Sequence, residues 1–149
     1  MIADALLSTA HFAAVFLLIG VLGAEFAALR APLTADGIKR LAMIDRLYGL
    51  AAILVIVAGV SRVYFGLKDE SFYWGQHAFW TKIGAFVLVG IISIWPTMRF
   101  IAWSRASKVS DSYRPPPAEV KGVRRLLMFE GMLILVIVID AALMARGIG

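Results

Sequence analysis

The stretch Ser61–Lys82, SRVYFGLKDESFYWGQHAFWTK, lies between two long apolar runs and decides how the chain folds. It is polar and aromatic, and it carries Arg62, His77 and Lys82, which are charged or can become charged. Each neighbouring run is long enough to cross the hydrocarbon core of a bilayer, which takes about 20 apolar residues in a helix. We therefore expect this stretch to be a hairpin at one face of a membrane.

The composition agrees with a membrane protein. Of the 149 residues, 61% are hydrophobic and 17% are charged, whereas about a quarter of the residues of a soluble domain are charged. The mean hydropathy is +0.85. Four spans are expected in a single domain, at about residues 5–29, 45–67, 79–103 and 126–145. Short connections make consecutive helices antiparallel neighbours. The predicted fold is therefore all-α, a polytopic, up-down bundle of four transmembrane helices.

The basic residues are spread unevenly between the two faces of the membrane. Eleven of the fifteen lie at or beyond one edge, namely Arg30, Lys39, Arg40, Arg46, Arg99, Arg105, Lys108, Arg114, Lys121, Arg124 and Arg125. The other four are Arg62, Lys68, Lys82 and Arg146. By the positive-inside rule, the first and third loops are cytoplasmic, and both termini face outward. The net charge of +5 therefore indicates membrane orientation and contact with lipid headgroups, and it does not indicate nucleic acid as a partner.

Several ionisable side chains fall inside the spans, where such groups are rare and usually face the bundle interior. Antiparallel packing sorts them into two layers. The outer layer contains His11, Arg62, Lys82 and Asp140. The inner polar layer contains Glu25, Asp45, Tyr48 and Glu130, together with Arg46, Arg99 and Arg125. Opposite charges within a layer can pair, which lowers the cost of keeping them in lipid, and Arg62 with Asp140 is the pair expected in the outer layer.

These residues also have purely structural interpretations. Arg62 and Asp140 could form an ion pair that only holds two helices together. Lys82 could extend its amine to the membrane surface, and His11 could be a neutral histidine hydrogen-bonded to a neighbouring helix. The chain contains no cysteine, no nucleotide-binding loop and no HExxH motif, and its loops are too short for a catalytic domain. Any chemistry is therefore expected inside the bundle.

Four segments carry a resemblance to a known family: GAEFAALR (23–30), DRLYGLAAILVIVAGVSRVYFGLKDESFY (45–73), FWTKIGAF (79–86) and SIWPTMRFIAW (93–103). They resemble a bacterial inner-membrane family of unknown function, over nearly the whole chain. The resemblance implies a bacterial inner-membrane location and marks seven positions of the family pattern, namely Glu25, Asp45, Tyr48, Arg62, Lys68, Lys82 and Pro96. It implies no activity.

The chain is also similar to HemJ-type protoporphyrinogen oxidases, which are four-helix membrane proteins that bind haem. Their first-helix histidine would correspond to His11, and their third-helix lysine to Lys82. Their Arg-Leu-Tyr would fall on residues 46–48, and their fourth-helix glutamate on Glu130. Where that family has Trp-x-His-x-Lys, this chain reads HAFWTK at residues 77–82. The similarity implies haem ligation by His11.

Three functions follow from these observations. The first is a membrane protein that binds haem, porphyrin or another redox cofactor in its outer half, with His11 as the metal ligand and Arg62, Lys82 and Asp140 around the cofactor. The second is a non-enzymatic accessory module, or a small-solute or ion-handling module, with a structural polar core. It would act as a homo-oligomer or with a partner membrane protein. The third is a copper-handling protein that uses His11, His77 and methionines. Whether the protein is an enzyme stays open.

Overall fold

Four long helices form nearly all of the chain that the structure, a computed structural model, describes, which comprises residues 2–66, 74–75 and 77–145. They are α1 (Ile2–Ala28), α2 (Ala35–Phe65), α4 (His77–Val109) and α5 (Pro117–Ala145). Each helix is long and apolar enough to cross a membrane, and the described residues contain no β-strand. The predicted all-α, polytopic four-helix bundle is therefore confirmed. The cations Lys68 and Arg146 lie outside the described residues.

Helix α2 begins ten residues before the expected start of the second span, because its first turn is capped. Thr34 is the N-cap, and its hydroxyl oxygen accepts a hydrogen bond from the backbone N–H of Gly37 at 3.3 Å. This contact satisfies one of the amide groups that have no partner within the first turn of a helix. At the other end, the N–H of Gly66 donates to the Arg62 carbonyl at 3.0 Å. Arg62 therefore lies in the last turn of α2 and not in the hairpin.

Helix α5 also begins earlier than expected, at Pro117. Proline is favoured at the first helical position, because the amide hydrogen that it lacks would have no partner there. The carbonyl of Pro116 accepts the first hydrogen bonds of the helix, from the N–H groups of Glu119 and Val120. The polar residues after Pro117 therefore belong to the first turns of α5.

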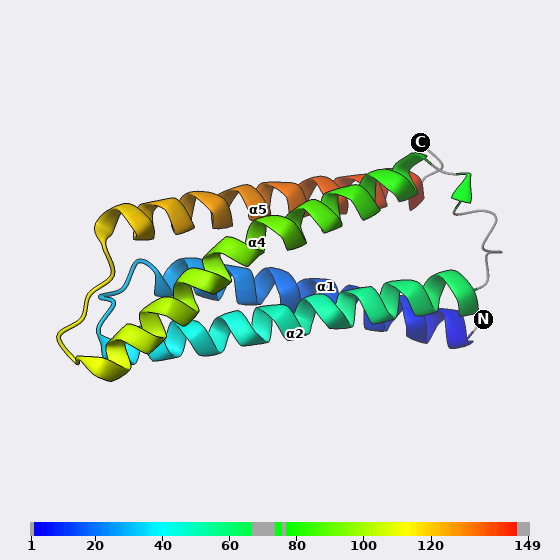
Figure 1. The fold of residues 1–149 in the computed structure, drawn as a ribbon. Helices are drawn as coiled ribbons and strands as arrows, with labels where there is room; N and C mark the ends of the chain where they lie inside the picture. The colour runs from blue at the N-terminus through cyan, green and yellow to red at the C-terminus, as the bar shows by residue number, and fades with distance from the viewer. Residues whose placement is uncertain (1, 67–73, 76, 146–149) are drawn as a thin grey trace.

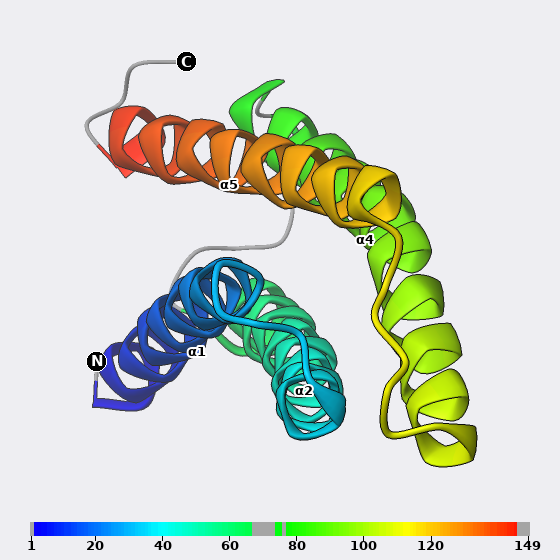
Figure 2. The same ribbon diagram turned by 90° about the vertical axis from the view of Figure 1, so that its left-hand side faces the viewer.

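The four helices are arranged as two antiparallel hairpins, α1 with α2 and α4 with α5 (Figure 1). The hairpins meet mainly where α2 contacts α4, and of the helix pairs that touch, α1 and α5 share the smallest contact. The start of α1 and the end of α5 lie at one end of the bundle (Figure 1), which we call the termini end. The opposite end carries the connections 29–34 and 110–116, and we call it the loop end. Toward the loop end, α4 diverges from α5 and approaches α2 (Figure 2).

Close packing is confined to the half of the bundle next to the loop end. The largest fully buried side chains all lie there: Trp103, Phe100, Ile38, Leu41, Glu25, Glu130, Val123 and Pro96. In the other half, no described side chain of residues 2–13, 56–66, 77–88 or 135–143 is buried. A membrane protein turns much apolar surface to lipid in any case. The two hairpins therefore pack against each other toward the loop end and lie farther apart toward the termini end (Figure 1).

Candidate functional site

Three carboxyl groups from three helices lie within electrostatic range of one another inside the close-packed half. Glu25 of α1 is 1% exposed, Asp45 of α2 is 9% exposed, and Glu130 of α5 is fully buried at 0%. Their charges act on one another when they are ionised, since Glu25 interacts electrostatically with both Asp45 and Glu130, and Glu130 interacts with Asp45. We call these three residues of the predicted inner polar layer the carboxyl cluster (Glu25, Asp45 and Glu130).

Two hydroxyl groups donate hydrogen bonds into the carboxyl cluster. The Tyr48 hydroxyl donates to Glu130 Oε2 at 3.0 Å, and the Thr97 hydroxyl donates to Asp45 Oδ1 at 2.7 Å. Two other carboxyl oxygens of the cluster, Glu25 Oε1 and Glu130 Oε1, are buried and have no hydrogen-bond partner. Buried polar atoms are nearly always bonded, so these two oxygens mark a place where a proton or a small polar ligand could bind.

Thr97 is a member of the site that the sequence interpretation missed. It follows Pro96 in α4, and a single threonine in an apolar run carries no sign of the residue that it faces. Tyr48, by contrast, is predicted for the inner polar layer from its position near the start of the second span. The partner that the structure assigns to it is Glu130.

The basic residues predicted for the inner polar layer do not form ion pairs with the carboxyl cluster. Within the described residues, the ion pair joins Arg99 Nη1 to Glu119 Oε1 at 3.3 Å, and Trp103 Nε1 also donates to Glu119 Oε2 at 2.9 Å. Arg46 acts electrostatically on Asp45, but its own side chain is exposed. The carboxyl cluster is therefore acidic without a basic partner in direct contact. No group of three or more metal-ligating side chains in the described chain is arranged to hold a metal ion.

The predicted outer layer lies in the loosely packed half, near the termini end. Arg62 and Lys82 act electrostatically on His11, and Arg62 and Asp140 act on Lys82, so the structure brings all four residues into one neighbourhood. His11 faces α2, where a Cβ atom placed on Gly59 would lie 3.3 Å from its Cε1 and 3.5 Å from its Nδ1. The glycine thus lets the imidazole lie against the α2 backbone.

The expected ion pair between Arg62 and Asp140 is absent from this neighbourhood. Arg62 Nε and Asp140 Oδ2 are each buried without a hydrogen-bond partner, and the guanidinium instead lies 5.9 Å from the centre of the Phe12 ring. Position along the helices puts the two residues at the same depth. An ion pair also requires each helix to be rotated about its axis so that the two side chains face each other, and depth in the membrane does not determine that rotation. His11 Nδ1 is a third buried atom here that makes no hydrogen bond of good geometry, and the backbone of Val55 in α2 also acts on the imidazole.

Comparisons with known proteins give one match. Residues 3–149 match the family model described as "Predicted membrane protein (DUF2214)". No curated protein matches the chain, and no solved structure matches it, so these comparisons give no support to the predicted similarity to HemJ-type oxidases. The family match covers nearly the whole chain and agrees with the four membrane-length helices. The chain therefore belongs to the DUF2214 family of predicted membrane proteins.

Proposed function

We propose that this integral membrane protein handles protons, and that the carboxyl cluster is where it binds and releases them. The observation that carries the proposal is the burial of Glu25 and Glu130, each with one carboxyl oxygen that has no hydrogen-bond partner. Ionisable groups inside membrane spans are costly and mark proton relays and ion pathways.

The cost of burying charge supports a proton as the ligand. Three buried, ionised carboxylates within electrostatic range of one another, without a basic group in contact, would pay a desolvation penalty that nothing offsets. Protons bound within the cluster remove that penalty and give the unpartnered oxygens a hydrogen to share. A metal ion fits less well, because the described side chains do not form a ligand set for one. Tyr48 and Thr97 donate from two sides and would hold the carboxyl groups in place as protons come and go.

Proton flux into proteoliposomes tests this function. Purified protein is reconstituted with a pH-sensitive dye inside the vesicles, and a membrane potential is imposed. We expect flux above that of protein-free vesicles, and we expect Glu25→Gln to abolish it because the amide cannot take up a proton. Asp36→Asn is the matched control, since Asp36 is an exposed acid in the first turn of α2. Flux equal to that of empty vesicles, or unchanged flux in Glu25→Gln, would refute the proposal.

A second candidate is the binding of a redox cofactor, with haem as the named example, near the termini end. It is favoured by three buried atoms without hydrogen-bond partners on three helices: His11 Nδ1, Arg62 Nε and Asp140 Oδ2. Arg62 and Lys82 would bind the carboxylates of such a group. The imidazole edge with Nδ1 and Cε1 faces Gly59, so an iron atom would have to approach at Nε2. The fit is therefore partial, and His11 is the residue that would supply the ligand.

The optical spectrum of the purified protein separates the two candidates. A haem protein shows a Soret band that His11→Ala removes while the helical content stays the same. A protein without this band, but with proton flux that depends on Glu25, handles protons through the carboxyl cluster alone.

A further inference from the structure

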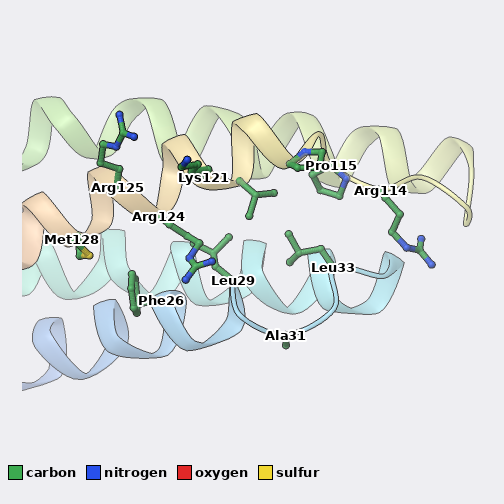
Figure 3. A pocket seen from close by; sticks show the side chains of 12 residues that line it. Phe26, Leu29, Ala31, Leu33, Arg114, Pro115, Lys121, Arg124, Arg125 and Met128 are labelled. Carbon is green, nitrogen blue, oxygen red and sulfur yellow. The ribbon is translucent and has the colours of Figure 1, made fainter.

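A cavity of about 730 Å³ opens at the loop end (Figure 3), and no residue of the carboxyl cluster lines it. It lies between the first turns of α5, the last turn of α1 and the two connections at that end. Its lining is formed by Phe26, Leu29, Ala31, Leu33, Arg114, Pro115, Pro117, Val120, Lys121, Arg124, Arg125 and Met128. The residues divide into a basic set and an apolar set, and none of them is acidic.

The basic set concentrates positive charge at the cavity. Arg114, Lys121, Arg124 and Arg125 line it. The Arg124 guanidinium lies 5.9 Å from the centre of the Phe26 ring, and Arg30 lies 4.8 Å from the same ring. The nearest acid of α5, Glu119, is already bonded to α4 through Arg99 and Trp103. Figure 3 shows the Arg124 side chain extending into the cavity, whereas those of Arg114 and Arg125 extend away from it. No acidic side chain lines the cavity, so an anion there would meet positive charge that no carboxylate offsets.

The apolar set continues the cavity toward the membrane interior. Phe26 of α1 and Leu29 of the following connection line it together with Val120 and Met128 of α5. Met128 is 58% exposed and lies one helical turn, about 6 Å, deeper than Arg124. A ligand that fills the cavity would therefore meet positive charge at the loop end and hydrocarbon toward the bilayer.

We propose that this cavity binds an anionic phospholipid. Its phosphate would be bound by Arg124 and Lys121, and an acyl chain would follow Met128 into the seam between α1 and α5. Of the helix pairs that touch, these two share the smallest contact. They approach each other again at Gly131, where an added Cβ would lie 3.9 Å from Leu22 Cδ2. Basic pockets between transmembrane helices at the cytoplasmic face recognise lipid headgroups by the same chemistry.

The combination of basic and apolar residues in the lining favours a lipid over a small inorganic anion. A free phosphate ion would use the basic residues and leave the half-buried Phe26 and the exposed Met128 uncovered. An amphiphile covers both sets at once, and each basic residue near an anionic headgroup is worth roughly fivefold in affinity.

The test uses delipidated protein in detergent, with native mass spectrometry to count bound dioleoyl phosphatidylglycerol against dioleoyl phosphatidylcholine. We expect the anionic lipid to bind more tightly. We also expect the double variant Lys121→Gln, Arg124→Gln to lose about 25-fold in affinity for it, as two removed charges predict. The variant Arg124→Lys keeps the charge and should keep most of the binding. Circular dichroism verifies that each variant retains its helices.

The matched control is the double variant Lys39→Gln, Arg40→Gln. Both residues are exposed cations near the start of α2, at the same end of the bundle, and neither lines the cavity. This control should change the affinity for phosphatidylglycerol by less than about twofold, because the charges that it removes are not at the site. An equal loss in the control variant, or equal binding of the two lipids, would overturn the proposal. Displacement of the lipid by inorganic phosphate alone would overturn it too, by identifying a site for free anions.

Discussion

Replacing Tyr48 with phenylalanine removes a single hydroxyl group from the carboxyl cluster and should destabilise the bundle. The hydroxyl donates to Glu130 Oε2, and the other carboxyl oxygen of Glu130 already has no partner. The ring of Tyr48 is buried in the core at 5% exposure, and phenylalanine preserves that packing. The loss in the free energy of unfolding therefore reports the hydrogen bond itself and the cost of leaving the Glu130 carboxyl group buried without that donor.

The protonation state of the acceptor sets the expected magnitude. A hydrogen bond to a neutral acceptor, as the proposed protonated cluster would provide, contributes about 0.5–1.5 kcal/mol, and one to an ionised group about 1.5–3 kcal/mol. Hydrogen bonds between side chains of neighbouring helices in a membrane protein contribute about 0.6 kcal/mol on average in double-mutant cycles. We therefore expect a coupling of about 1 kcal/mol between Tyr48 and Glu130, and a value near 3 kcal/mol would indicate that Glu130 is ionised.

The assay is a double-mutant cycle of Tyr48→Phe and Glu130→Leu, with unfolding in sodium dodecyl sulphate followed by tryptophan fluorescence. Leucine is chosen because glutamine could still accept the tyrosine hydrogen bond. If the bond is as described, Tyr48→Phe costs about 1–2 kcal/mol alone and almost nothing in the Glu130→Leu background. Tyr64→Phe serves as the control, since Tyr64 is exposed near the end of the same helix. Additive losses in the cycle, or an equal loss in the control, would refute the assigned bond.

Three further predictions concern packing and topology. Gly59→Leu should destabilise the fold by about 1–3 kcal/mol in the same unfolding assay, because the new side chain would meet His11. Gly49→Leu, with nothing within 4 Å of the added Cβ, should cost far less, and equal losses would contradict the packing. Trp103→Phe should cost about 2 kcal/mol by removing the bond to Glu119, and no loss would mean that the bond contributes nothing. A reporter in the α4–α5 connection should be cytoplasmic and one at the C-terminus external. The reverse pattern would show that the predicted orientation is wrong.

The sequence by itself determined the number of helices and the depth of each polar side chain. Both properties follow from the chain alone: hydropathy over about 20 residues identifies a span, and a fixed rise per residue converts position into depth. For this reason Glu25, Asp45, Tyr48 and Glu130 were assigned to one layer before any contact was known. The ends of the helices were harder to place, because the Thr34 cap and the proline at the start of α5 extend them through polar sequence.

Only the tertiary structure decided which side chains touch. The Tyr48 hydroxyl bonds to Glu130, which is 82 residues away in the sequence, and Thr97 bonds to Asp45, which is 52 residues away. Arg62 and Asp140, in contrast, lie at the same depth and do not pair. A contact between two helices depends on how each is rotated about its axis and on the angle at which they cross. Those quantities are set by side-chain packing over the whole interface, and no local stretch of sequence contains them.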